Sequence, residues 1–178
     1  MKRNILLPIV TIALSAAILL GASLALSGVA RENGKREHLQ IMQTLLPGSE
    51  NFTVEPYTGD DANIVSVHKA ENGFVIETVT RGYVDDIRML IGVSNDGKVT
   101  GLVVRELDET FGLGAAALTD TDFLAQFLNT SGEAEVGTNV DALTGATVTS
   151  KAVTRAVNSA VAYVTGADAS SGATSWGG

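Results

Sequence analysis

An uncharged apolar run near the N-terminus constrains this chain more than any other feature. Residues 5–30 contain no Asp, Glu, Lys or Arg, and the basic residues Lys2 and Arg3 come just before them. About 20 apolar residues are enough for a helix to cross the hydrocarbon core of a bilayer. A cleaved signal peptide, with Gly28-Val29-Ala30 before Arg31 as its small-residue site, is the alternative, but its apolar region is typically only about 7–15 residues long. We therefore predict a retained transmembrane helix over residues 5–30, and a separate folded domain after it.

The charges that flank this run bear on its orientation. Residues 1–4 are basic, and the tendency of positive flanks to stay inside places them in the cytoplasm. Arg31, Lys35 and Arg36 on the other flank act against this assignment. The sequence predicts a single-pass protein of the cytoplasmic (inner) membrane whose folded domain lies on the extracytoplasmic side.

The remainder of the chain is acidic and has no cysteine. The chain has 12 basic and 20 acidic residues, of which only two basic ones lie within residues 1–30, so the rest carries a formal charge of −10 (10 basic against 20 acidic). A nucleic-acid role is disfavoured, because no basic stripe exists to neutralise phosphates. The lack of cysteine excludes cysteine-ligated iron–sulfur clusters, c-type haem and disulfides, and His38 and His68 have no partner at metal-ligand spacing, so no metal site is predicted. If this chain moves electrons, an organic cofactor must carry them.

In the middle of the chain the apolar period shortens towards two, as in β-strands. Four segments rich in β-branched residues are predicted strands: 64–67, 74–79, 87–93 and 99–104. The turn signals Glu71-Asn72-Gly73 and Asn95-Asp96-Gly97 divide each pair, which predicts an antiparallel meander. The flanking segments are predicted as a connecting helix (31–46, stopped by Pro47-Gly48), a loop (50–62), a short helical core cluster (123–128) and a polar connector (131–140).

A small hydroxyl-rich loop, Thr144-Gly145-Ala146-Thr147, comes just before a predicted amphipathic helix. The apolar residues of this helix recur three or four positions apart: Val153, Val157, Val161 and Val164. We predict Thr149 or Ser150 as its N-cap, and Lys151, Arg155 and Asn158 as solvated. The hydroxyls of Thr144 and Thr147 would then stand ahead of a helix start, where free N–H groups and the helix dipole favour a phosphate. On spacing alone, a simple cap and turn is the commoner explanation.

The residue sequence of this loop is more informative than its position before a helix. Asp141-x-x-Thr144-Gly145-Ala146-Thr147 resembles the Asp-x-x-Ser/Thr-Gly-Ala-Thr motif of the FMN-binding domain family. That family includes the G subunit of the Rnf electron transport complex and the C subunit of the sodium-pumping NADH:quinone reductase. In it, a flavin transferase joins FMN through its phosphate to the hydroxyl of the last threonine. The resemblance implies covalent FMN on Thr147, with Asp141, Thr144, Gly145 and Ala146 completing this part of the site.

A second loop, Glu109-Thr110-Phe111-Gly112-Leu113-Gly114, resembles the Glu-Thr-Pro-Gly-Leu-Gly loop of the same family, which lies near the flavin. Phe111 replaces the usual proline, which bears on the rigidity of the loop more than on its location. The resemblance implies non-covalent FMN contacts from the residues of this loop: Glu109, Thr110, Gly112 and Leu113.

Three other segments bear on this interpretation. Leu45-Leu46-Pro47-Gly48 and Gly82-Tyr83 also resemble the family, although Tyr83 itself is predicted to be a packing residue. Residues 168–174 repeat the Asp-x-x-Ser-Gly-Ala-Thr pattern, but no apolar helix follows them, and small polar residues at a terminus are usually disordered. We therefore predict that Thr174 is not the attachment site, and whether it is also modified stays open.

These segments follow one another in the same order as in the FMN-binding domain family, and they cover nearly the whole chain. They predict an α+β FMN-binding domain, an antiparallel sheet with packed helices, on a single N-terminal transmembrane helix. The predicted parts are a cytoplasmic N-terminus (1–4), the transmembrane helix (5–30), a linker helix and loop (31–60), the FMN-binding domain (61–166) and a flexible tail (167–178).

The resemblance to the Rnf G subunit implies an electron-relay subunit of a membrane-bound, ion-translocating ferredoxin:NAD oxidoreductase. Its partners would be the other subunits of that complex, and a flavin transferase for maturation. No residue pattern indicates a general base, a nucleophile or a hydride-transfer site, and no Gly-x-Gly-x-x-Gly signals NAD binding, so no catalytic residue is predicted.

Three alternatives stay open at this point. The C subunit of the quinone reductase would carry the same flavin chemistry, but it is usually longer between anchor and motif. A free-standing flavinylated extracytosolic electron carrier or reductase is the second. The third is a membrane-anchored binding module without a flavin.

Overall fold

The computed structural model describes residues 6–107 and 119–167, and the chain divides into two compact units, Met1–Ile41 and Met42–Gly178. The first unit consists, in its described part, of helix α1 (Leu6–Leu45), whose last residues belong to the second unit. The predicted helices 5–30 and 31–46 are therefore one continuous element. Within the described ranges, no helix meets the length and apolarity needed to cross a membrane.

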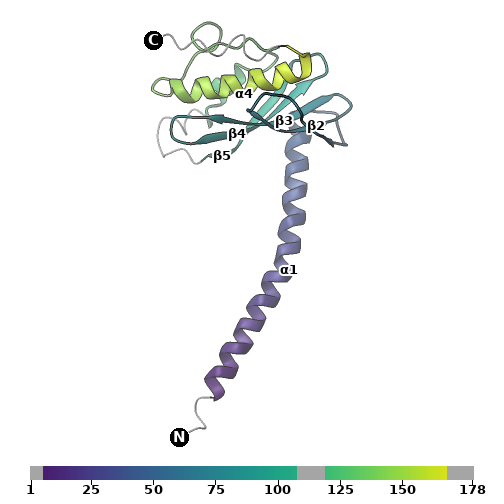
Figure 1. Cartoon of the computed structure of the whole chain (residues 1–178), viewed down its shortest axis with the longest axis vertical. Coiled ribbons are helices and arrows are strands. Elements are labelled where there is room, and N and C mark those ends of the chain that lie inside the picture. The colour runs from purple at the N-terminus through teal and green to yellow at the C-terminus, as the bar shows by residue number, and fades with distance from the viewer. Residues whose placement is uncertain (1–5, 108–118, 168–178) are drawn as a thin grey trace. The chain divides into compact units, whose positions relative to one another are not determined.

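The second unit is built on a five-stranded antiparallel sheet in the order β1-β2-β3-β4-β5 (Figure 1). The strands are β1 (Thr53–Glu55), β2 (Ile64–Lys69), β3 (Gly73–Arg81), β4 (Asp86–Ser94) and β5 (Val99–Leu107). The predicted meander is confirmed, and each predicted strand extends further than expected. Strand β1 was missed inside the predicted loop, because three residues are too few to show a period and Val54 at its centre is 65% exposed.

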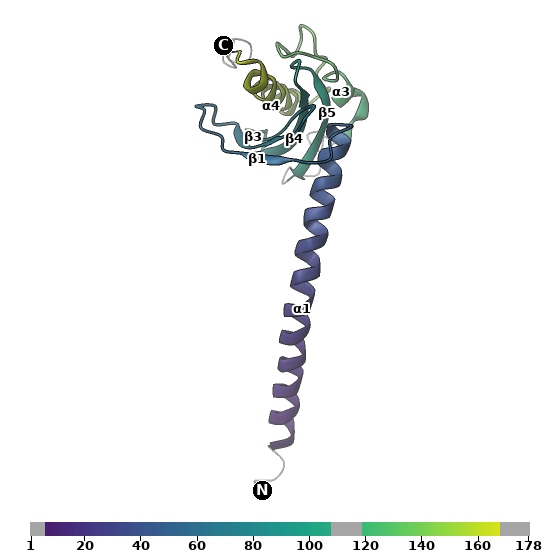
Figure 2. The same ribbon diagram turned by 90° about the vertical axis from the view of Figure 1, so that its right-hand side faces the viewer.

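Helix α4 (Thr147–Thr165) lies across one face of the sheet (Figures 1 and 2). The side chains of β4 that face it alternate along the strand and are fully buried: Ile87, Met89, Ile91 and Val93. The helix contributes its valine stripe and the small residues beside it: Ala152, Val153, Ala156, Val157, Ala160 and Val161. Each fully buried aliphatic side chain of this size contributes about 1.5–3 kcal/mol, so this layer holds helix and sheet together. The prediction of an α+β domain with an antiparallel sheet is confirmed.

The opposite face of the sheet receives the end of α1. Met42, Leu45 and Leu46 are buried within the second unit. Gly92 points to this face, and a Cβ there would lie 2.4 Å from the Leu45 carbonyl oxygen. Only glycine permits this close approach. The Thr100 hydroxyl donates to the same oxygen, so the end of α1 is held by both packing and a hydrogen bond.

A short helix, α3 (Thr121–Ala125), precedes the motif loop along the chain. The Asp120 side chain caps it by accepting from the Phe123 N–H at 2.9 Å. Phe123 and Phe127 enter the core, where their rings meet edge to face with centroids 5.4 Å apart. The predicted helical core cluster is thus found, except that Leu128 at its end is 43% exposed.

Candidate functional site

Helix α4 begins at Thr147, the last residue of the motif. Its N-cap is Ala146, whose side chain cannot accept a hydrogen bond from the first turn. The prediction of Thr149 or Ser150 as N-cap is therefore wrong: both are buried inside the first turn. Ser150 Oγ instead donates to the Ala146 carbonyl at 2.9 Å and accepts from the Leu143 N–H at 3.3 Å. The serine stabilises the loop ahead of the helix, a role that spacing alone does not distinguish from capping.

Residues 143–146 form a tight turn that presents the motif. The Ala146 N–H donates to the Leu143 carbonyl at 2.9 Å, and Gly145 has φ of +79°. A positive φ at the third position of a β-turn is typical of type II, and this position strongly favours glycine. Ala146 is buried and Leu143 packs against the core, so both ends of the turn are fixed. Thr144 and Gly145 between them remain exposed.

The loop is also held where the motif begins, by a residue outside it. The Asp141 N–H donates to Gln126 Oε1 at 2.8 Å, and Gln126 Nε2 donates to the Asp141 carbonyl at 3.2 Å. Gln126 is the C-cap residue of α3. Sequence reasoning missed this residue. Its position among the phenylalanines of the helical cluster was visible, but no pattern indicated its partner.

The structure brings part of the predicted site together at the start of α4. Asp141, Thr144, Gly145 and Thr147 are exposed, and Ala146 is buried beneath them. The other predicted FMN contacts, Glu109, Thr110, Gly112 and Leu113, lie outside the described residues. The strand that leads into them, β5, ends at Leu107 opposite Ile87 of β4.

The same end of the sheet carries the turn between β3 and β4. Arg81 and Asp86 form the last pair of these strands, next to the pair of Ile87 with Leu107. The Thr80 hydroxyl donates to the Ala152 carbonyl in α4 at 3.1 Å. The end of β5, the β3–β4 turn and the N-terminal half of α4 therefore lie at one end of the domain.

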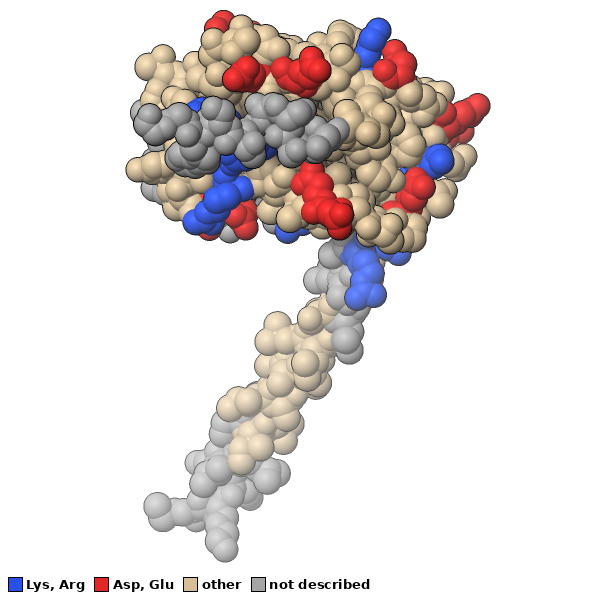
Figure 3. Space-filling model, turned by 45° about the horizontal axis from the view of Figure 1, so that its top comes forward, with Lys and Arg blue, Asp and Glu red and all other residues tan. Residues whose placement is uncertain are grey.

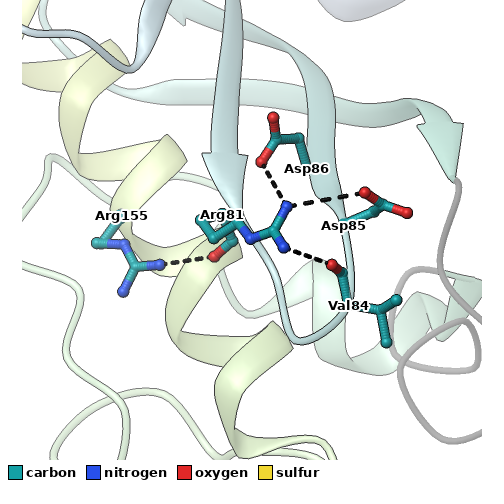
Figure 4. Close-up of polar contacts among 5 residues, drawn as sticks. All are labelled: Arg81, Val84, Asp85, Asp86 and Arg155. Atoms are coloured by element: carbon teal, nitrogen blue, oxygen red, sulfur yellow. Dashed lines mark hydrogen bonds and ion pairs between the residues drawn. The ribbon is translucent and has the colours of Figure 1, made fainter.

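Two arginine residues, Arg81 and Arg155, hold the β3–β4 turn in place (Figure 4). Arg155 Nη2 of α4 donates to the Arg81 carbonyl at 2.9 Å. The Arg81 guanidinium donates to the Val84 carbonyl at 2.7 Å and reaches the carboxylates of Asp86 at 3.4 Å and Asp85 at 3.7 Å. These ion pairs are exposed, so they set the shape of the turn more than they add stability.

Two predictions about single residues are wrong. Tyr83 in the β3–β4 turn is 75% exposed, whereas it was expected to be a packing residue. Asn158 was expected in solvent but is buried, and its amide accepts from the Ala134 N–H at 3.0 Å and donates to the Ala134 carbonyl at 2.9 Å. Helical periodicity placed it off the valine stripe, but it does not reveal that a loop covers that side of α4.

Helix α4 has basic but no acidic side chains, although the domain as a whole is acidic. Acidic side chains are spread over the domain face seen in Figure 3. Residues 147–165, in contrast, contain Lys151 and Arg155 and no Asp or Glu. Lys151 is exposed and lies one helical turn after Thr147, on the same side of the helix.

This arrangement fits a phosphate group. Within the described residues no side chain caps the first turn of α4, and the N-terminal end of its dipole is positive. The exposed Thr147 hydroxyl is available for a covalent bond. The described residues hold no cluster of three His, Asp or Glu side chains that could bind a metal ion.

Comparison with known proteins gives a family match and several relatives. Residues 82–162, from the β3–β4 turn into α4, match the FMN-binding domain family. The G subunit of an ion-translocating oxidoreductase complex of Methanosarcina acetivorans is 36% identical over 141 residues, which are 70% of this chain and 73% of that protein.

Two further relatives carry more specific names. The G subunit of the Na(+)-translocating ferredoxin:NAD(+) oxidoreductase complex of Acetobacterium woodii is 28% identical over 160 residues, which are 76% of this chain and 77% of that protein. The G subunit of the proton-translocating complex of the same type from Clostridium ljungdahlii is 39% identical over 99 residues, about half of each chain (52% and 53%).

Proposed function

This chain belongs to the FMN-binding family of G subunits of ion-translocating oxidoreductase complexes, and on that premise we propose that it is the electron-relay subunit of an Rnf-type ferredoxin:NAD oxidoreductase. The observation that carries the proposal is the motif Asp141-x-x-Thr144-Gly145-Ala146-Thr147, held on a fixed turn at an uncapped helix start. The relatives from Acetobacterium and Clostridium are named for different ions, so similarity to them assigns no coupling ion to this chain.

Thr147 carries the FMN through a phosphodiester. Its Oγ1 attacks the flavin-side phosphorus of a flavin dinucleotide such as FAD, since the monophosphate of FMN is not activated for this transfer. The Oγ1–P bond forms as the pyrophosphate P–O bond breaks, AMP leaves, and the hydroxyl proton passes to a base of the flavin transferase. No electron is gained or lost in this maturation step.

The neighbouring motif residues shape the attachment site. Gly145 and Ala146 set the turn that exposes Thr144 and Thr147, and the first N–H groups of α4 would hold a phosphate attached to Thr147. Asp141 marks the start of the motif and keeps its carboxylate in solvent. We assign the non-covalent flavin contacts to Glu109, Thr110, Gly112 and Leu113, which follow β5 in the sequence.

Bound FMN supplies the electron-transfer chemistry, and the chain supplies attachment, orientation and the local electrostatic field. Lys151 and Arg155 are the basic side chains of α4 nearest the phosphate in sequence, and they favour its negative charge. We expect no catalytic residue in this chain, since its sequence shows no pattern for a general base, a nucleophile or a hydride-transfer site. Electrons enter and leave through contacts with the other subunits of the complex.

The anchor part of the proposal rests on the sequence. The uncharged residues 5–30 cross the cytoplasmic membrane once, with residues 1–4 inside and residues 61–166 as the FMN-binding domain outside. Residues 31–60 lie between the two in the sequence and include the end of α1 and strand β1, which pack with the folded domain. Protein that leaves the membrane fraction in alkaline carbonate would contradict the anchor without affecting the flavin assignment.

Intact mass and peptide mapping of protein co-expressed with a flavin transferase test the proposal directly. One FMN on the peptide that contains Thr147 is the expected result. Two FMN groups, with the second on Thr174, would make the tail a second carrier. No FMN on any peptide would contradict the flavin relay and return the start of α4 to an ordinary helix terminus. Co-purification with integral membrane partners would separate a member of the complex from a free-standing carrier.

A further inference from the structure

We propose that Gln126 is a positioning residue for flavin attachment: it holds the start of the motif loop so that Thr147 is presented to the flavin transferase. This inference rests on the proposed function. It concerns a residue outside the sequence motif, and it gives that residue a role in maturation rather than in electron transfer.

The contact itself is specific in geometry. The Gln126 side-chain amide pairs with both backbone groups of Asp141, at 2.8 Å and 3.2 Å, as a neighbouring strand would. Within the described residues, no other group forms a hydrogen bond with Asp141. A side chain with only an acceptor or only a donor cannot make both bonds.

The element that carries Gln126 is firmly anchored. Phe123 and Phe127 flank it in sequence and are both buried in the core. Asp120 caps the helix start at 2.9 Å. Gln126 therefore extends from a fixed part of the domain, and it can transmit that fixed position to the start of the motif.

The motif loop then has three points of attachment. Gln126 holds Asp141, Ser150 holds the Leu143 N–H, and the buried Ala146 closes the turn. Between these points only Thr144 and Gly145 project to solvent, and Thr147 follows directly. A transferase that binds this loop finds it already ordered, so it does not have to order it on binding.

A neighbouring loop offers a matched control. Asn139 Oδ1 accepts from the Glu135 N–H at 2.7 Å, and Asn139 Nδ2 donates to the Glu133 carbonyl at 2.9 Å. This is also a two-bond contact between an amide side chain and exposed backbone, and it lies close to the motif in sequence. It bonds only its own loop, so its loss should leave the position of Asp141 unchanged.

The experiment compares transfer kinetics of full-length chains in detergent. Wild type, Gln126→Ala, Gln126→Glu and Asn139→Ala are incubated with flavin transferase and FAD, and AMP release and protein-bound flavin fluorescence are followed against chain concentration. We expect Gln126→Ala to lower kcat/KM about tenfold, mainly through KM, because an ordering cost is added to binding. Gln126→Glu keeps the acceptor but loses the donor and should fall between, whereas Asn139→Ala should stay within about twofold of wild type.

Thermal melting of each chain separates positioning from general stability. Gln126→Ala and Asn139→Ala should melt at similar temperatures while differing in KM. Equal transfer kinetics for Gln126→Ala and wild type, or an equal loss in Asn139→Ala, would overturn the inference and leave the proposed function in place. A wild-type chain that accepts no FMN would overturn the proposed function itself.

Discussion

The two ends of helix α4 are built in different ways. At its C-terminus Gly166 adopts φ of +70° and donates its N–H to the Ala162 carbonyl at 2.8 Å, as a left-handed helix cap does. The Thr165 hydroxyl adds a bond to the Val161 carbonyl at 2.9 Å. At the N-terminus, by contrast, Ala146 offers the first turn no side-chain acceptor.

The C-terminal end of α4 is also more closely packed than the N-terminal end. Tyr163 near the C-terminus meets the rings of Tyr57 and Phe74 edge to face, each with centroids 5.8 Å apart. Thr147 and Lys151 at the other end are exposed. A good N-cap is worth about 1 kcal/mol, which this helix does not gain. The C-terminal end of α4 is therefore built for local stability, whereas the N-terminal end leaves its N–H groups available to a ligand.

The largest expected effect comes from removing the attachment point. Thr147→Ala should abolish covalent flavin, because it removes the hydroxyl to which the phosphate of FMN is joined. Its stability should change by no more than about 0.5 kcal/mol, since the side chain is exposed and is not the N-cap. In-gel fluorescence of denatured protein and intact mass measure the flavin. Thr174→Ala in the tail is the control and should keep full labelling. Covalent flavin on Thr147→Ala would contradict the assignment.

The second largest effect comes from replacing the glycine at each end of α4, because the two variants should lose similar stability but differ in flavin attachment. Gly145 at φ +79° and Gly166 at φ +70° both adopt left-handed backbone, so alanine at either position should cost about 1–2 kcal/mol. A methyl group added at Gly166 would meet only open space, which leaves the backbone as the only cost. Gly145→Ala should also slow flavin attachment severalfold, whereas Gly166→Ala should not. Urea unfolding and the labelling assay measure the two effects. Similar labelling of both variants would remove the functional distinction between the ends.

The sequence was enough to predict the sheet and the motif, but not the side-chain contacts that hold the motif loop and helix α4 in place. The meander followed from alternating β-branched residues and from the Asn95-Asp96-Gly97 turn, which are local features. The motif at Thr147 was likewise readable as a string of residues. Gln126 and Asn158 could not be assigned, because their partners lie 15 and 24 residues away and are brought close only by packing.

The N-cap error has a related cause. Thr149 and Ser150 are ordinary capping residues by type, and nothing local shows that the N-cap is Ala146, three residues before Thr149. The start is fixed by burial of Ala146 and by the bond from Leu143 to Ser150, both of which depend on the folded loop. Tyr83 was misjudged because aromatic residues usually pack inside, whereas here the turn ends at the surface.

A smaller effect is expected where a phosphodiester on Thr147 meets Lys151. The two positions lie four residues apart on α4, so a negative group at Thr147 and the ammonium form a helical ion pair worth about 0.2–0.5 kcal/mol. Lys151→Gln should lower the melting temperature of flavinylated protein slightly, and less so at high salt. In the Thr147→Ala background the same change should have no such salt-dependent effect. An equal effect in both backgrounds would place the interaction elsewhere.

The smallest effect concerns the C-terminal half of α4 and its response to pH. Burial raises the pKa of Tyr163 above its ordinary value of 10.0, and the nearby Glu55 and Tyr57 add to the rise. Because the folded-state pKa is raised, this tyrosine contributes stability that is fully present below the unfolded pKa and is lost as pH rises through the folded pKa. Tyr163→Phe keeps the ring contacts with Tyr57 and Phe74 but removes the ionisable group. Its urea midpoint should therefore fall less steeply than that of wild type as pH rises above about 10.

Flavin attachment at Thr147 should be the same in both chains when measured near neutral pH. An identical alkaline slope would show that Tyr163 does not couple to folding, and a loss of labelling would show that the two ends of the helix are not independent.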